Sequence, residues 1–84
     1  MKEAGETPMR ITLNGEPHEV ALGDTIASIL HSLGQHPRTV AVEYNGEIVH
    51  RDSYSTTPIA PGDHLEVVRF VQGGAGSAPA LRLP

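Results

Sequence analysis

The chain contains no cysteine and no tryptophan, and only one phenylalanine and two tyrosines among its 84 residues. Without cysteine it cannot form disulfides, thiolate metal sites or an iron–sulfur cluster, and no side-chain thiol can carry sulfur. No apolar run approaches the length of a membrane span, and the first ten residues lack the hydrophobic segment of a signal peptide. We therefore expect a cytoplasmic protein without membrane contact.

Positive charge is also scarce. Six Lys and Arg stand against ten Asp and Glu, which gives a formal net charge of −4, and the two signs are scattered along the chain. Such a distribution argues against a nucleic-acid partner and favours a protein partner with a basic surface. The length is enough for one small domain with one modest core.

Two Asn-Gly pairs predict β-hairpins. Apolar and polar residues alternate on both sides of the pair at 14–15, which predicts two strands within residues 9–22. Pro17 indicates that this first loop is longer than two residues. The second pair, at 45–46, predicts a strand and a short strand within residues 39–49.

A helix is predicted between the hairpins. Its apolar face recurs at helical spacing and consists of Ile26, Ile29, Leu30 and Leu33. Asp24 or Thr25 can cap the first turn, and Gly34 suits the left-handed position just beyond the end. Pro37 then prevents the helix from continuing.

The last predicted strand covers residues 64–71 and carries a candidate partner-binding patch. After Glu66, the apolar residues Val68 and Phe70 fall on the same face as Glu66. Exposed apolar side chains there would form a docking patch. Alternatively, a bulge turns Phe70 back into the core.

The predicted order is strand, strand, helix, strand, short strand, an irregular crossing at residues 50–58, and strand. These features are typical of an α+β protein with a β-grasp, or ubiquitin-like, fold. In this fold one helix packs on one face of a mixed sheet of four to five strands.

The chain divides into a disordered extension at residues 1–8, a β-grasp domain at 9–71 and a flexible tail at 72–84. After the Gly73-Gly74 pair the tail has no hydrophobic period, so it cannot bury enough surface to offset its ordering entropy. Glycine passes through narrow channels because it has no Cβ. We therefore interpret Gly74 as a chemical terminus covered by a removable segment.

Two stretches give the chain a family resemblance, "VAVEYNGEIVHRDSY" at residues 40–54 and "PGDHLEVVRFVQGG" at 61–74. The chain resembles the ThiS family, within the wider ThiS and MoaD group of β-grasp sulfur carriers, from about residue 9 to residue 74. The most specific elements are Asn-Gly-Glu-Ile-Val followed by Arg51, the Gly-Asp turn, and a hydrophobic strand that ends in Gly-Gly.

The resemblance implies a sulfur carrier rather than an enzyme, with no bound cofactor. An E1-like (ThiF-like) adenylyltransferase would use ATP to activate the carboxylate of Gly74, which follows Gly73. A sulfur donor such as a cysteine desulfurase would then convert it to a thiocarboxylate. A ThiG-like thiazole synthase would accept the sulfur in thiamine biosynthesis. The residues expected to contact partners are Val68, Phe70, Val71 and Gln72.

Because Gly74 is in an amide bond to Ala75, the resemblance also implies a metal-dependent peptidase that removes residues 75–84. Two alternatives remain open at this point. The sulfur could serve another pathway, namely cysteine, molybdopterin or tRNA thiolation. The chain could also be a ubiquitin-like protein modifier or interaction module.

The remaining polar residues predict no metal or catalytic site. None of the histidines pairs at a clear metal-ligand spacing; they are His18, His31, His36, His50 and His64. Asp24 and Asp63 are interpreted as a cap and a turn residue rather than as acid and base catalysts. His50 and Tyr54 stand where the ThiS family often has Pro and Trp.

Overall fold

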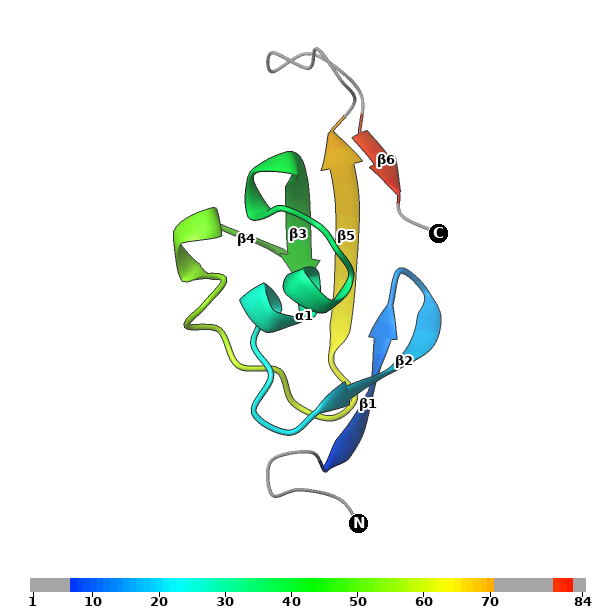
Figure 1. Ribbon diagram of the computed structural model, residues 1–84. Coiled ribbons are helices and arrows are strands. Elements are labelled where there is room, and N and C mark those ends of the chain that lie inside the picture. The colour runs from blue at the N-terminus through cyan, green and yellow to red at the C-terminus, as the bar shows by residue number, and fades with distance from the viewer. Residues whose placement is uncertain (1–6, 71–79, 83–84) are drawn as a thin grey trace.

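The computed structural model describes residues 7–70 and 80–82, which form one sheet with a helix on it (Figure 1). In chain order the elements are β1 (Pro8–Leu13), β2 (Glu16–Ala21), α1 (Ile26–Ser32), the 3₁₀ helix η1 (Pro37–Thr39), β3 (Val40–Tyr44), β4 (Glu47–Val49), the 3₁₀ helix η2 (Arg51–Ser53), β5 (His64–Phe70) and β6 (Ala80–Arg82). Up to β5, the strands and the helix follow the predicted order.

The sheet has the strand order β2-β1-β5-β3-β4, and β6 also pairs with β5. β1 and β5 are parallel, whereas every other pair in the described residues is antiparallel. Parallel neighbours need a long crossover connection, and α1 lies within the one that joins β1 to β5 (Figure 1). This mixed sheet with a single helix confirms the predicted β-grasp fold.

The first hairpin turns over only two residues, Asn14 and Gly15, so the prediction of a longer loop was wrong. Both residues have positive φ angles, 51° and 83°, as a tight hairpin turn requires. Pro17 lies opposite Thr12, whose N–H points away from β2 and donates to the Asp63 carbonyl over 2.9 Å. In such a pair the proline nitrogen also points outward, at the sheet edge, where a missing N–H removes no ladder bond.

The helix begins at a capping box. Thr25 Oγ1 accepts from the Ser28 N–H over 3.2 Å, and Ser28 Oγ accepts from the Thr25 N–H over 2.8 Å. Of the two predicted caps, Thr25 is therefore the one used, while Asp24 supports it by accepting from Ser28 Oγ over 2.8 Å. Gly34 follows the end of the helix with φ of 72°, as predicted.

The core lies between α1 and the sheet. Its buried residues are Met9, Ile11, Val20, Ile26, Ile29, Leu30, Val40, Val42, Tyr54, Ile59, Leu65 and Val67. The predicted helix face supplies three of them, and Leu33 packs against the cluster from its side. The crossing before β5 adds Tyr54 and Ile59, which no periodicity had indicated, and the Tyr54 carbonyl accepts from the Ala27 N–H over 3.0 Å.

The two ends of the chain are described only in part. Most of the predicted extension at residues 1–8 lies outside the described residues, although β1 already includes Pro8. Residues 80–82 form β6, a strand for which the composition of the tail offered no indication. Within residues 7–70 and 80–82, no helix has the length and apolar character needed to cross a membrane.

Truncation of Ile29 should reveal the contribution of the core. Ile29 is 1% exposed and Ile48 is 70% exposed. We expect Ile29→Ala to lower the free energy of unfolding by about 2–5 kcal/mol, because it leaves a cavity in a packed interior. Ile48→Ala, the same truncation on the surface, should change it by about 0.5 kcal/mol or less. Urea unfolding followed by circular dichroism measures both, and equal losses would contradict this core assignment.

Candidate functional site

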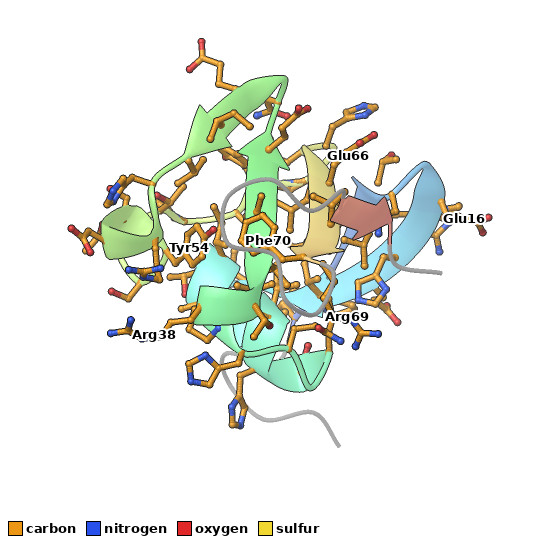
Figure 2. The ribbon with its side chains drawn as sticks, turned by 90° about the horizontal axis from the view of Figure 1, so that it is seen from above. Glu16, Arg38, Tyr54, Glu66, Arg69 and Phe70 are labelled. Carbon is orange, nitrogen blue, oxygen red and sulfur yellow. The ribbon has the colours of Figure 1, made fainter. Side chains whose placement is uncertain are left out.

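The predicted site residues fall into two groups. Val71, Gln72, Gly73 and Gly74 lie outside the described residues. Val68 and Phe70 are described and lie in β5. Figure 2 looks onto the end of the molecule where β5 finishes, and Phe70 is visible there. The described part of the candidate site is therefore the surface that leads to the glycine pair.

Phe70 is exposed, and the alternative in which a bulge returns it to the core was wrong. The pairing of β3 with β5 runs without interruption from Tyr44 opposite Leu65 to Val40 opposite Arg69. A bulge would place two residues of one strand opposite one of the other, and this register contains none. The alternation of side chains therefore continues to Phe70, which is 48% exposed.

The part of the sheet surface opposite α1 that β3, β4 and β5 form is called here the open face. It consists of Ala41 and Glu43 from β3, Ile48 from β4, and His64, Glu66, Val68 and Phe70 from β5. Most of these side chains line two adjoining hollows, of which the larger has a volume of about 440 Å³. Ile48, directly opposite Glu43, adds a second exposed apolar side chain to the face.

Sequence reasoning found the β5 side of this face but missed Ala41, Glu43 and Ile48. A two-residue turn at Asn45-Gly46 places residue 44 opposite 47 and therefore 43 opposite 48. That register was available from the sequence and would have identified Ile48. Ala41 lies opposite Val68 because β3 pairs with β5, and the sequence has no local signal for that pairing.

Two carboxylates give the open face a negative character. Glu43 and Glu66 lie directly opposite each other on β3 and β5, and both line both hollows. Like charges directly opposite each other on neighbouring strands destabilise a sheet. The face therefore combines apolar side chains with a pair of carboxylates, which suits a partner surface with apolar and basic groups.

Asp63 anchors one end of the open face. Its Oδ2 accepts from Tyr44 Oη over 2.5 Å and from the Ala60 N–H over 2.8 Å, and its Oδ1 accepts from Asn45 Nδ2 over 3.3 Å. Asn45 Oδ1 in turn accepts from the His64 N–H over 2.8 Å. These bonds hold the turn between β3 and β4 against the beginning of β5.

The same contacts shift the pKa values of Asp63 and Tyr44. Burial by itself raises the pKa of Asp63. The hydrogen bonds from Tyr44, Ala60 and Asn45 together lower it by a larger amount, so the pKa lies below its ordinary value of 3.8. The hydrogen bond to Asp63, followed by burial, raises the pKa of Tyr44 above 10.0. An aspartate held ionised by several donors is a poor general base, in agreement with its interpretation as a turn residue.

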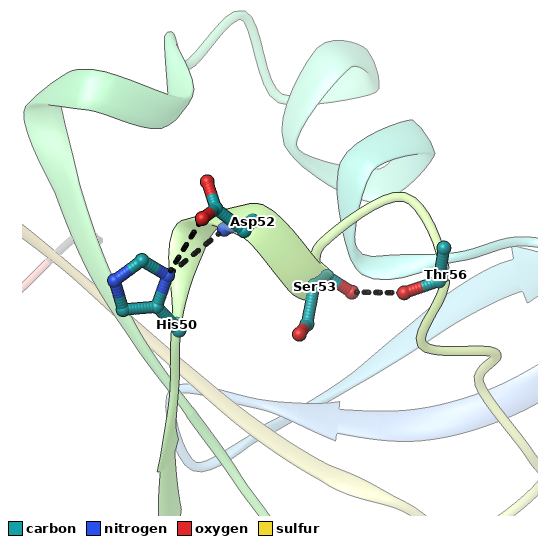
Figure 3. A network of polar contacts seen from close by, with 4 residues as sticks. All are labelled: His50, Asp52, Ser53 and Thr56. Atoms are coloured by element: carbon teal, nitrogen blue, oxygen red, sulfur yellow. Dashed lines mark hydrogen bonds and ion pairs between the residues drawn. The ribbon is translucent and has the colours of Figure 1, made fainter.

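His50 caps the 3₁₀ helix η2 (Figure 3). Its Nδ1 accepts from the Asp52 N–H over 3.2 Å and lies 3.6 Å from Asp52 Oδ2, and Thr56 Oγ1 donates to the Ser53 carbonyl over 3.2 Å. His36 caps η1 in the same way. Across residues 7–70 and 80–82, no three His, Asp or Glu side chains form a group that could hold a metal ion.

Comparison with known proteins shows which family the chain is similar to. A family model described as the ThiS family matches residues 11–74. The sulfur carrier protein ThiS of Thermus thermophilus is 36% identical over 64 residues, which is 76% of this chain and 98% of that protein. A crystal structure of the thiamine biosynthesis protein ThiS from Geobacter metallireducens is similar with a TM-score of 0.68 and 33% identity. That similarity covers 79% of this chain and all of the other.

Two longer proteins contain a related segment. A thiazole synthase of Magnetococcus marinus is 44% identical over 66 residues, and one of Paramagnetospirillum magneticum is 40% identical over 73 residues. The matches cover 79% and 87% of this chain but only 20% and 22% of the two synthases. The chain therefore spans about a fifth of the length of these relatives.

Tyr44→Phe should weaken the fold in a pH-dependent way. The lowered pKa of Asp63 means that its ionised form contributes stability above the ordinary value of 3.8. This contribution disappears as the pH falls through the folded-state pKa. Loss of the Tyr44 hydroxyl should therefore cost about 1–2 kcal/mol near neutral pH and progressively less in acid.

Urea unfolding at neutral pH and in the acid range tests this expectation. Tyr54→Phe is the matched control, since the pKa of Tyr54 is raised mainly by burial and no acidic group contributes to its shift. A Tyr44→Phe loss that does not decrease in acid would contradict the assigned role of the hydrogen bond.

Proposed function

The chain belongs to the ThiS family, and on this basis we propose that it is a sulfur carrier that functions in thiamine biosynthesis. One observation supports this most strongly: the family match extends over nearly the whole described domain and ends at Gly74. The absence of cysteine agrees with this role, because the sulfur would be held at the main-chain terminus. The chain would then be a cosubstrate of its partner enzymes.

In the proposed reaction, Gly74 becomes a carboxylate when the peptide bond to Ala75 is hydrolysed by a peptidase, which removes residues 75–84. An oxygen of that carboxylate then attacks the α-phosphorus of ATP on an E1-like adenylyltransferase, and pyrophosphate leaves. The terminal sulfur of a persulfide on a donor such as a cysteine desulfurase attacks the acyl carbon, and AMP leaves. A second thiol then attacks the donor's sulfur in the resulting acyl disulfide, forms a disulfide with the donor and releases the acyl-bound sulfur. The product is a thiocarboxylate at Gly74.

The open face supports docking to the partner enzymes. Phe70 and Val68 lie at the end of β5, just before the residues that lead to Gly74. A partner that covers this end of the sheet would therefore receive the C-terminus close to its binding surface. The opposed carboxylates Glu43 and Glu66 would complement basic groups on that partner and would speed its association at low salt.

A thiazole synthase is the proposed sulfur acceptor. Two proteins of that name contain a segment related to this chain within a fifth of their length. The presence of a related segment in the same polypeptide supports a working relationship between the carrier domain and the synthase. On this proposal, the acceptor takes the sulfur directly from the thiocarboxylate of Gly74.

Gly74→Trp should abolish sulfur loading without unfolding the chain. A chain that ends at residue 74 is incubated with ATP, the adenylyltransferase and a sulfur donor, and intact mass spectrometry records the oxygen-to-sulfur exchange. The bulky side chain should block entry into the active site, because the passage is proposed to admit only glycine. Urea unfolding of both forms is the folding control. Normal thiocarboxylate formation by Gly74→Trp would rule out the terminal role.

Phe70→Ser should weaken binding to the adenylyltransferase about tenfold or more, because aromatic anchors dominate many interfaces. Leu22→Ser is the matched control, since Leu22 is 56% exposed but lies after β2 rather than on the open face. Titration calorimetry with each variant measures the affinity. If both variants bound as tightly as the unaltered chain, the open face would not be the docking surface.

A further inference from the structure

One backbone edge of β5 bonds to three other parts of the same chain, namely β1, the Asn14 side chain and β6. The carbonyls of Asp63 and Leu65 accept from the N–H groups of Thr12 and Asn14, each over 2.9 Å. The backbone groups of a strand point alternately to its two sides. Odd-numbered residues of β5 therefore direct their N–H and carbonyl groups toward β1, and even-numbered residues direct theirs toward β3.

The ladder with β1 ends at Asn14, where the chain turns away with a positive φ angle of 51°. The Asn14 side chain then continues the pattern in place of a strand. Its Oδ1 accepts from the Val67 N–H over 2.8 Å, and its Nδ2 donates to the Val67 carbonyl over 3.2 Å. The next odd-numbered residue on this edge is Arg69, which β1 does not reach.

β6 lies at this position. It pairs with β5 in antiparallel orientation, with Leu81 opposite Arg69 and Ala80 opposite Phe70. Figure 1 shows β6 beside the end of β5, beyond the hairpin of β1 and β2. β1, the Asn14 side chain and β6 thus follow one another along a single edge and together occupy it up to Phe70.

We propose that β6 is a removable cover for the end of this edge, kept in place only while the chain is uncut. This inference rests on the proposed cleavage after Gly74. Ala80 lies opposite Phe70 of the same chain, so the pairing is intramolecular. A three-residue strand gains little from its few backbone bonds and depends on the high effective concentration that a tether provides.

Cleavage after Gly74 removes that tether. The segment that contains β6 then becomes a separate peptide, and its pairing with β5 becomes bimolecular and weak. The backbone groups of Arg69 would lose their partner next to the exposed side chain of Phe70. The cut that creates the Gly74 carboxylate would therefore also open the edge beside the docking face, and an unpaired edge can accept an extended segment of another protein.

The test is amide hydrogen exchange at Arg69, measured by NMR on four forms of the chain. The forms are the full chain, the chain ending at residue 74, Leu81→Pro and Arg82→Pro. Leu81 is opposite Arg69, so its N–H points at β5, and proline there removes a ladder bond. The N–H of Arg82 points away from β5 by alternation, so proline at this adjacent position is the matched control.

We expect the Arg69 amide to exchange slowly in the full chain and in Arg82→Pro. It should exchange about tenfold faster or more in Leu81→Pro and in the chain ending at residue 74. The Val67 amide, bonded to Asn14, should remain equally protected in all four forms and serves as an internal reference. Equal exchange at Arg69 in all forms, or continued protection in the shortened chain, would overturn the proposal.

This readout is independent of sulfur chemistry. A chain ending at residue 74 that failed to accept sulfur would count against the proposed function, but it would not change the protection of Arg69. Conversely, an unprotected Arg69 amide in the full chain would contradict the proposal that β6 covers this edge, and it would not affect the proposed role as a sulfur carrier.

Discussion

The position of β5 between β1 and β3 is the constraint on which the other features of this protein depend. Backbone bonds on both of its sides leave the strand no freedom to rotate, so the two faces of the sheet are determined along its whole length. Leu65 and Val67 must point into the core, and Val68 and Phe70 must point to the open face. β5 ends at Phe70, so the open face extends to the last residue described before the glycine pair.

Two turn asparagines reinforce this arrangement. Asn14 and Asn45 each occupy a left-handed turn position that few other residues tolerate. Each also uses its side-chain amide to bond to the backbone of β5, at Val67 and at His64. The residue type that allows a tight turn thus also ties each hairpin to the central strand, so local and tertiary requirements coincide at one side chain.

The open face has two features that do not favour the stability of the isolated domain. A sheet surface selected only for stability would not place Glu43 directly opposite Glu66, nor leave Phe70 exposed. Both features become reasonable if another protein covers the face, because the partner would supply basic groups and bury the apolar side chains. Asp63, by contrast, accepts hydrogen bonds from Tyr44, Asn45 and Ala60 and stabilises a turn.

Much of the fold followed from local signals in the sequence. The Asn-Gly turns, the capping box of the helix, the glycine that ends it and the apolar helix face each depend on residues within a few positions of one another. The glycine pair was visible in the sequence, and the family resemblance added the sulfur-carrier role and the proposed chemistry at Gly74. Tyr54, at a position where the ThiS family often has Trp, became recognisable as a core residue only in the folded structure.

The amino-acid sequence by itself determined the order of the strands and helix up to β5, because periodicity and turn chemistry act over short distances. Only the tertiary structure decided the two-residue turn beside Pro17, the exposure of Phe70 and the pairing of β6 with β5. Each of these depends on which strand lies next to which, and in what register. Strand neighbours come from distant parts of the chain, and no local pattern records which of them will meet.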